Sequence, residues 1–381
     1  MKILLLGSKE YPFNSSYKWD KCAGGGYEVH VDKLAKYLVK SGHEVVIVTR
    51  RFPDQSVEED FFDGKLKVFR VSYMHHQSLR TITYLRNSYV FLKKYFKDNT
   101  VDVLHAHGAI AAHYCDKLSK SFRIPYVYTP HGVTTGWPFP LLQLLTRWED
   151  HSVKRAGMVY HISTREKRIL AKKNGKFANM LITNAIDLDD YKSSIRRNWK
   201  EVRFIFLGRL EEIKGIKYMM DAFNRLVKKD IENGKVKARL FVAGKGRYTE
   251  WMKDYISKND LYDHVVLYDW VTDVPAMYGQ TDVFVLPSWE RGQPFAMLEA
   301  QAAGKLVLSS LPYIVDGKSG VKCKSKDTAD LYKKMKDIAV NYTKYKKIAA
   351  AGKKDVESRG WSAVVDKIVE GYNIACMQKV K

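Results

Sequence analysis

Residues 286–304 read Leu286-Pro287-Ser288-Trp289-Glu290-Arg291-Gly292-Gln293-Pro294-Phe295-Ala296-Met297-Leu298-Glu299-Ala300-Gln301-Ala302-Ala303-Gly304. A short apolar strand ends at Pro287 and a loop follows. A helix is predicted to begin near Pro294, because proline is favoured at the first helical position. Glu299 falls on an otherwise apolar helix, where an unpaired carboxylate would be costly. Either a ribose diol or a neighbouring Lys or Arg side chain would serve as its partner.

The same succession of strand, loop and helix runs through the whole chain and is typical of parallel α/β domains. A helix is predicted over Val29–Lys40, where Val31, Leu34, Ala35 and Leu38 recur at helical spacing. The predicted strands are Lys2–Leu6, Glu44–Val48, Lys67–Val71, Val103–Ala106, Tyr126–Thr129 and Met158–Ile162 in the first half, and Arg203–Leu207, Arg239–Ala243, Val265–Leu267, Val283–Leu286 and Leu306–Ser309 in the second.

A chain of 381 residues is long for one ordinary domain and suits two. The polar stretch 192–200 precedes a fresh strand and is interpreted as a linker. We therefore predict a first domain over residues 1–191, a second over 200–358, and a C-terminal helix over 359–381. Ligands of open parallel sheets bind beyond the carboxyl ends of the strands, so we expect the functional residues in those loops.

The composition narrows the function classes. The net charge of +23 favours anionic partners, namely nucleic acid, acidic lipid surfaces or phosphorylated ligands, but solvated Lys side chains would give the same value. The four cysteines are scattered without metal-binding spacing and are interpreted as reduced thiols of a cytosolic protein. No apolar run is long enough to span a membrane, and the N-terminus reads as a strand rather than a signal peptide.

Three further segments carry candidate chemistry. Gly24-Gly25-Gly26 leads into the first helix, where free backbone N–H groups suit an anion, although a glycine triplet is more often a flexible loop. His131 follows a predicted strand, and a histidine satisfied by local hydrogen bonds would look the same. Arg209 and Lys214 follow the first strand of the second half and suit a diphosphate, although a solvated turn would also hold such cations.

A pair of histidines ends another predicted strand. His105 and His107 are two residues apart on that strand, so their side chains should point to the same side. They could be metal ligands, but no third ligand is evident in the sequence. We therefore expect a structural role for the pair.

Together these segments resemble glycosyltransferase family 4, the retaining enzymes of the GT-B fold. The likeness runs over nearly the whole chain and lies in the order and spacing of its motifs. They are Gly24-Gly25-Gly26, Ser41-Gly42-His43-Glu44-Val45, Asp102-Val103-Leu104-His105-Ala106-His107, Thr129-Pro130-His131-Gly132, Asn184-Ala185-Ile186-Asp187, Gly208-Arg209-Leu210 with Lys214-Gly215, Ala243-Gly244-Lys245-Gly246, the 287–304 block and Trp361-Ser362.

The resemblance implies an α/β fold of two Rossmann-like domains that face each other across a cleft. It implies that Arg209 and Lys214 bind the diphosphate of a nucleotide-sugar donor, that Glu299 holds the ribose and that His131 lies beside the donor sugar. Gly25 and Gly26 would line the phosphate side, Phe295 and Ala296 would contact sugar or phosphate through their backbone, and Trp270 and Val271 would lie near the base. The chain departs from the family at Arg291, which occupies the place of a Glu in the usual Glu-Gly-x-Pro context.

The expected reaction is retaining transfer of a hexose to a glycan or lipid-linked acceptor hydroxyl. We expect no metal cofactor, since no acidic metal-binding motif appears, and no nucleic-acid partner, since no recognised motif accompanies the charge. The alternatives are another GT-B enzyme, such as a nucleotide-sugar epimerase, or a basic nucleic-acid-binding protein.

The expected location is cytoplasmic. Residues 79–97 interleave aromatic and basic side chains and could lie on the inner face of an anionic membrane, near the apolar stretch 139–145. The alternative is that Tyr84, Leu85, Val90, Phe91 and Leu92 pack against the first sheet while the Lys side chains are solvated.

Overall fold

The computed structural model describes residues 1–12, 26–76, 79–132, 140–182, 184–191, 200–269, 271–289 and 294–378, without the side chains of residues 140–145 and 165. They form two compact units. Unit 1 contains Met1–Ala185 together with Trp361–Lys381, and unit 2 contains Ile186–Gly360. No helix among the described residues is both long and apolar enough to cross a membrane.

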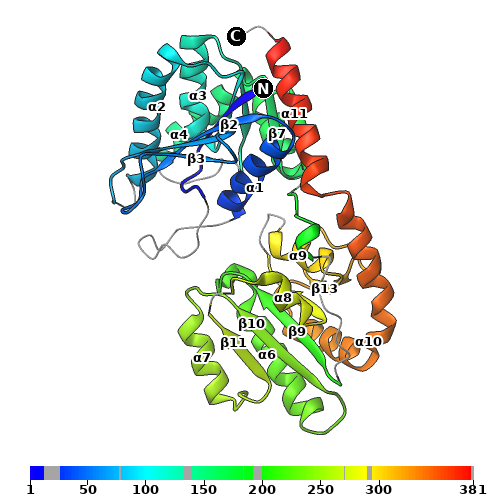
Figure 1. Ribbon diagram of the computed structural model, residues 1–381. Helices are drawn as coiled ribbons and strands as arrows, with labels where there is room; N and C mark the ends of the chain where they lie inside the picture. The colour runs from blue at the N-terminus through cyan, green and yellow to red at the C-terminus, as the bar shows by residue number, and fades with distance from the viewer. Residues whose placement is uncertain are drawn as a thin grey trace. The chain divides into compact units, whose positions relative to one another are not determined.

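Unit 1 is built on an eight-stranded sheet in the order β3-β4-β2-β1-β5-β6-β7-β8 (Figure 1). All neighbours are parallel except β3 with β4. The strands are β1 (Lys2–Leu6), β2 (Glu44–Arg50), β3 (Glu58–Phe61), β4 (Leu66–Val71), β5 (Val103–His107), β6 (Tyr126–Thr129), β7 (Met158–His161) and β8 (Asn179–Leu181).

Helices cover both faces of this sheet. They are α1 (Gly26–Lys40), α2 (Arg80–Asp98), α3 (Ala109–Phe122), α4 (Pro140–Arg155), α5 (Thr164–Asn174) and α11 (Trp361–Met377). Because alternate side chains of a strand point to opposite faces, Ile3 and Leu5 join the core beneath α1 and α11. Leu4 and Leu6 instead join the core beneath α2 and α3.

The last helix of the chain belongs to the first unit. In Figure 1, α11 (red) runs beside α1 (blue), and the two helices are in contact. The apolar side chains of α11 are buried in the unit 1 core, namely Trp361, Val364, Val365, Ile368, Tyr372 and Ala375. Gly371 lets α11 approach β7, since a Cβ atom there would lie 2.3 Å from the Tyr160 hydroxyl oxygen.

Unit 2 is built on a six-stranded parallel sheet in the order β11-β10-β9-β12-β13-β14. Numbered from β9, this is the 3-2-1-4-5-6 order of a dinucleotide-binding sheet, with its topological switch point between β9 and β12. The strands are β9 (Val202–Leu207), β10 (Ala238–Ala243), β11 (Val265–Tyr268), β12 (Val283–Leu286), β13 (Leu306–Ser309) and β14 (Val321–Lys322).

The helices of unit 2 are α6 (Ile216–Leu226), α7 (Thr249–Lys258), α8 (Val274–Gly279), α9 (Phe295–Ala302) and α10 (Thr328–Glu357), with a 3-10 turn at Glu212–Lys214 and a π turn at Val227–Ile231. The division between the units falls before the 3-10 turn Asp189–Tyr191, whereas the sequence placed it after residue 191. The reason is that Ile186 and Tyr191 are buried in the core of unit 2. The predicted linker 192–200 lies outside the described residues except for Lys200.

The sequence-predicted strands are all present, with ends within one or two residues of the predicted ones. The helix predicted over Val29–Lys40 begins at Gly26. Of the segment proposed for a membrane surface, residues 80–97 lie on α2. Tyr84, Leu85 and Leu92 are buried against the sheet and the partly buried Phe91 packs on the same core, so the packing alternative is correct for these four side chains. It is wrong for Val90, which is exposed.

Candidate active site

The two segments of unit 2 that the sequence singled out lie together at the switch point. The Ser288 hydroxyl group, just after β12, donates a hydrogen bond to the Ile213 carbonyl oxygen at 2.8 Å, and the Trp289 N–H donates to the same oxygen at 3.1 Å. Gly215 closes the β9–α6 loop with φ +78°, and a Cβ atom there would lie 2.2 Å from the Pro287 carbonyl oxygen. The loops after β9 and β12 therefore form one continuous surface.

The loop after β10 joins this surface. A Cβ atom on Gly244 would lie 2.0 Å from the Gly208 carbonyl oxygen, and one on Gly246 would lie 2.4 Å from the Leu210 carbonyl oxygen. Only glycine permits such close backbone contact. Lys245 forms an exposed ion pair with Asp269, which follows β11, at 3.1 Å. Four consecutive loops at the carboxyl edge of the sheet are thus tied to one another.

The cationic side chains lie on this surface. Arg209 is exposed directly after β9, and Lys214 is half-buried at the end of the 3-10 turn. A fork of guanidinium donors and a mobile ammonium group at one strand-to-helix loop are suited to a diphosphate.

The helix α9 begins at Phe295, close to the predicted start near Pro294, and Pro294 is its N-cap residue. Phe295, Ala296 and Glu299 are half-buried. The Ala296 carbonyl oxygen accepts a 2.7 Å hydrogen bond from the Tyr278 hydroxyl group. Burial, together with the charge of Glu299, raises the pKa of Tyr278 well above its usual range.

Some predicted site residues cannot be placed. Gly25, Trp270, Glu290 and Arg291 lie outside the described residues, so their predicted roles stay predictions. Val271 is described and packs half-buried against the core of unit 2.

In unit 1 the predicted residue His131 follows β6 in a left-handed conformation with φ +56°, which is uncommon outside glycine. The next residue, Gly132, donates its N–H to Glu166 Oε1 at 2.9 Å, and the Ile162 N–H donates to Glu166 Oε2 at the same distance. Burial raises the pKa of Glu166 to about 7, although these two N–H groups oppose the shift. Glu166 thus links the turn after β6 to the start of α5.

Four histidines gather near this turn. His105 is buried between the Tyr372 hydroxyl group, 2.7 Å from its Nδ1, and the Thr129 hydroxyl group, 2.8 Å from its Nε2, so its role is structural as expected. The rings of His105 and His107 stack with centroids 4.1 Å apart, which confirms that they share one side of β5. His107 Nδ1 lies 2.9 Å from His131 Nε2.

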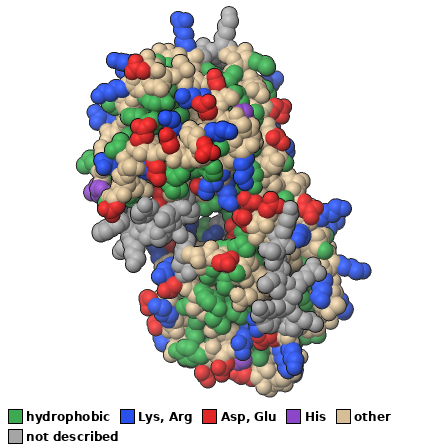
Figure 2. Space-filling model, in the orientation of Figure 1, with side chains coloured by type: hydrophobic (Ala, Val, Ile, Leu, Met, Phe, Trp, Pro, Cys, Tyr) green, Lys and Arg blue, Asp and Glu red, His purple; other side chains and the backbone are tan. Residues whose placement is uncertain are grey.

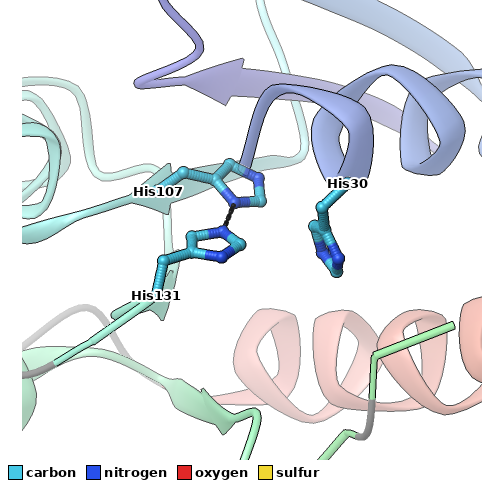
Figure 3. Close-up of side chains that lie close together, drawn as sticks. All are labelled: His30, His107 and His131. Carbon is cyan, nitrogen blue, oxygen red and sulfur yellow. Dashed lines mark hydrogen bonds between the residues drawn. The ribbon is translucent and has the colours of Figure 1, made fainter. Parts of the chain in front are cut away.

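The fourth histidine, His30 on α1, completes a cluster with His107 and His131 (Figure 3). The prediction that His107 has no third potential ligand partner was therefore wrong, because α1 and β6 bring imidazoles that are far from it in the sequence. Burial lowers the pKa of His30 to about 4, and burial followed by the neighbouring histidines lowers the pKa of His107 and His131 well below the usual range. All three rings are therefore neutral at pH 7.

Two residues of this region were missed by sequence analysis. The signal for Glu166 was present, because Ser163 and Glu166 have the Ser-x-x-Glu spacing of a capping box. The Ser163 hydroxyl group accepts from the Glu166 N–H at 3.2 Å, while the Glu166 carboxyl group accepts from Ile162 and Gly132. His30 carried no signal of its own, since a lone histidine on an amphipathic helix reads as an ordinary surface or core residue.

We expect Glu166→Gln to lower the free energy of unfolding of unit 1 by about 1–3 kcal/mol at pH 5, because a glutamine offers one acceptor oxygen to two N–H groups, whereas both oxygens of the protonated carboxyl group can accept. The folded protein keeps the Glu166 proton up to a pH of about 7, whereas the unfolded chain loses it near 4.5. The stability that wild type gains from this group therefore falls as the pH rises between those values.

Thermal unfolding of wild type and Glu166→Gln at pH 5 and pH 8 checks this prediction. The difference in stability between the two proteins should be larger at pH 5. Glu44→Gln, at an exposed position on β2, is the matched control and should leave the unfolding temperature unchanged. An equal deficit at both pH values would contradict the assigned protonation.

Charged side chains of both signs are mixed on the described part of one face of the molecule. Figure 2 shows Lys and Arg side chains interspersed with Asp and Glu side chains on the face drawn. Such mixing is typical of a solvated surface.

Comparison with known proteins agrees with this architecture. Among solved structures, a sucrose-phosphate synthase from Thermosynechococcus elongatus superposes with a TM-score of 0.78 at 16% identity, covering 98% of each chain. HepE from Anabaena in complex with UDP superposes with a TM-score of 0.73 at 15% identity, covering 98% of this chain and 99% of the other. The fold is therefore that of the GT-B glycosyltransferases.

Two family models of glycosyltransferases match the chain. The model for Glycosyltransferase Family 4 matches residues 24–190, and the model for Glycosyl transferases group 1 matches residues 201–341. The chain belongs to glycosyltransferase family 4 and is a glycosyltransferase.

The chain is also similar in sequence to curated relatives over most of its length. It is 26% identical to the Escherichia coli UDP-Gal:alpha-D-GlcNAc-diphosphoundecaprenol alpha-1,3-galactosyltransferase, over 71% of each chain. It is 25% identical to a glycogen synthase of Mycobacterium tuberculosis, over 98% of this chain and 94% of the relative.

Proposed function

We propose that this glycosyltransferase moves a hexose from a nucleoside diphosphate to an acceptor hydroxyl group with retention of anomeric configuration. The observation that carries the proposal is the meeting of the β9–α6 loop and the start of α9 at the switch point of unit 2. This places two cations, the first N–H groups of a helix and a carboxylate on one small surface, which is the set of groups that a nucleoside diphosphate needs.

Each group then has a role in binding the donor. Arg209 and Lys214 neutralise the diphosphate, the backbone at Phe295 and Ala296 contacts sugar or phosphate, and Glu299 accepts hydrogen bonds from the ribose hydroxyl groups. Gly25 and Gly26 line the phosphate side, and Trp270 and Val271 lie near the base. His131 acts beside the donor sugar.

In the transfer step, the bond between the anomeric carbon and the diphosphate oxygen breaks and a bond to the acceptor oxygen forms on the same face of the sugar. The acceptor proton passes to the leaving diphosphate. Charge therefore develops on the diphosphate, and Arg209 and Lys214 stabilise it without a metal cofactor. Fixed positioning of donor and acceptor supplies the rest of the rate enhancement.

The acceptor is a glycan or a lipid-linked glycan. The support is the name of the Escherichia coli relative, whose acceptor is a sugar on diphosphoundecaprenol. An acceptor held at a membrane surface also fits the net charge of +23.

A donor screen followed by product analysis tests the function. Nucleoside diphosphate sugars of different base and sugar should raise the unfolding temperature selectively, since a ligand that binds the folded state alone stabilises it. NMR of the product made from the best donor should show the anomeric configuration of the donor. An inverted product would overturn the retaining assignment, and the absence of any stabilising donor would overturn the donor site.

Arg209→Ala and Lys214→Ala should each weaken binding of the nucleoside diphosphate by about 1.5–3 kcal/mol, because each removes a charged hydrogen-bond donor. Calorimetric titration of the nucleoside diphosphate measures this directly. Lys229→Ala is the matched control, since Lys229 is exposed in the π turn that follows α6 at the opposite edge of the sheet from these loops. Wild-type affinity in both site variants would contradict the assignment.

We also propose a cytoplasmic location with peripheral attachment to an anionic membrane. Because Tyr84, Leu85 and Leu92 are buried, these side chains are not available to enter a bilayer, and we rest the attachment on charge. The protein should sediment with anionic vesicles at low salt and be released at high salt, each basic residue near the surface contributing about 1 kcal/mol. Protein that stays in the supernatant with anionic vesicles at low salt would contradict the attachment.

A further inference from the structure

Three imidazole rings from separate elements of unit 1 converge at one point. His30 comes from α1, His107 ends β5 and His131 follows β6, and their side chains point toward one another in Figure 3. One ring nitrogen of each residue lies within 4.8 Å of the corresponding nitrogens of the other two. His107 Nδ1 and His131 Nε2 are closest, at 2.9 Å.

Several of these nitrogens are buried without a hydrogen bond. Both ring nitrogens of His30 and Nε2 of His107 have no hydrogen-bond partner within the part of the chain that the structure describes. Both side chains are about 1% exposed. A buried polar atom without a partner costs about 1–3 kcal/mol, and such atoms in native proteins commonly mark the place of an ion or an ordered water.

We propose that His30, His107 and His131 form a binding site for a divalent transition-metal ion, and Zn²⁺ is the ion that fits best. Imidazole nitrogen suits zinc and its neighbours, whereas Mg²⁺ and Ca²⁺ require oxygen ligands. Zinc binds histidine nitrogen at about 2.0–2.1 Å in tetrahedral geometry, which sets two ligand nitrogens roughly 3.3 Å apart. The His107–His131 pair therefore needs to open slightly and His30 to move closer, with the fourth position left to water.

Zinc in this site would inhibit the enzyme. It would hold His131 as a ligand and so remove it from the donor sugar, a consequence that rests on the proposed function, whereas the binding itself does not. The ion is thus an inhibitor of the metal-independent transfer proposed above and is no cofactor for it.

The test uses the full chain without an affinity tag, after treatment with a chelator. Calorimetric titration with ZnCl₂ should show one tight site, and Co²⁺ should give the visible absorption of a tetrahedral complex. MgCl₂ should give no binding heat at this site. An absence of zinc binding, or binding without the tetrahedral cobalt signature, would overturn the proposal.

Two phenylalanine variants locate the site. His30→Phe keeps an aromatic ring against Trp361 and removes two unpartnered nitrogens, so it should fold and lose zinc affinity by more than about 100-fold, since even residues behind the ligands are worth 10–100-fold. His161→Phe is the matched control. His161 on β7 is equally buried with two unpartnered nitrogens but stands outside the cluster, so its variant should bind zinc like wild type. Wild-type affinity in His30→Phe would overturn the proposal.

The inhibitory consequence has its own readout. Once a donor is identified, zinc should abolish transfer by wild type and by His161→Phe, and a chelator should restore it. Donor binding, followed by thermal shift without zinc, tests the proposed function separately. Zinc that binds through His30 yet leaves transfer unchanged would refute the inhibition and the placement of His131 beside the sugar.

Discussion

Deletion of residues 361–381 is expected to unfold unit 1 of this glycosyltransferase. The deleted segment contains α11, which follows the whole of unit 2 in the chain but packs on the sheet of unit 1. Its apolar side chains, from Trp361 to Ala375, form one side of the core that also contains Ile3 and Leu5. The deletion would therefore expose the face of the sheet between β5 and β7 to water.

The stability that unit 1 loses on this deletion can be estimated from the apolar side chains that α11 buries. Each fully buried large apolar side chain contributes about 1.5–3 kcal/mol, and Val364, Val365, Ile368 and Tyr372 are all buried together with Trp361. The summed loss is similar to or larger than the whole stability of an ordinary domain, about 5–15 kcal/mol. The Tyr372 hydroxyl group is also the hydrogen-bond partner of Nδ1 of the buried His105, which would lose that bond and keep the one from its Nε2 to Thr129.

Soluble yield and thermal unfolding measure the outcome. We expect the truncated chain to lose one unfolding transition and to aggregate, while unit 2, whose core does not include α11, keeps its own transition. Deletion of residues 379–381 alone is the matched control and should leave both transitions unchanged, since α11 ends at Met377, which is 86% exposed. A truncated chain with the wild-type transitions would contradict the assignment of α11 to unit 1.

Gly215→Ala is expected to disrupt the donor site more than the substitution of any single charged residue. Two effects add at this position. The residue has φ +78°, a conformation that costs an alanine about 1–2 kcal/mol, and the new Cβ atom would lie 2.2 Å from the Pro287 carbonyl oxygen. The two atoms nearest to this Cβ position are the carbonyl oxygen and carbonyl carbon of Pro287, which belong to the backbone. The loops after β9 and β12 must therefore separate to relieve the collision.

A second glycine separates the two effects. Gly234 has φ +67° in a turn of the same unit, but nothing lies within 4 Å of its Cβ position. Gly234→Ala should therefore lower the stability of unit 2 by the conformational cost alone and keep wild-type affinity for the nucleoside diphosphate.

Thermal unfolding and calorimetric titration of both variants give the comparison. Gly215→Ala should show the larger drop in unfolding temperature and at least about a 10-fold loss of affinity, equivalent to about 1.4 kcal/mol. Equal behaviour of the two variants would show that the contact between Gly215 and Pro287 does not shape the donor site.

The strands of both sheets could be predicted because each is a local pattern. Runs such as Val283–Leu286 and Tyr126–Thr129 are apolar throughout, as expected of parallel strands with both faces covered. The strands that were missed are at or near the sheet edges. Glu58–Phe61 is charged and largely exposed, and Asn179–Leu181 and Val321–Lys322 are too short to give a pattern.

The sequence by itself determined the α/β class, the succession of elements and the loops in which the candidate residues lie. These follow from apolar periodicity and from glycine and proline, whose effects act over a few residues. The close approach of Gly215 to Pro287 followed only once β9 and β12 were neighbours in the sheet.

Tertiary structure alone decided what gathers around His131. His30 and His107 reach it from α1 and β5, and Glu166 on α5 binds the next residue, Gly132. No periodicity of the sequence relates these positions to one another. The physical reason is that strand order and helix packing depend on the joint burial of many apolar side chains, a property of the whole chain. Local patterns fix which residues can be buried, and only the packed unit fixes which of them meet.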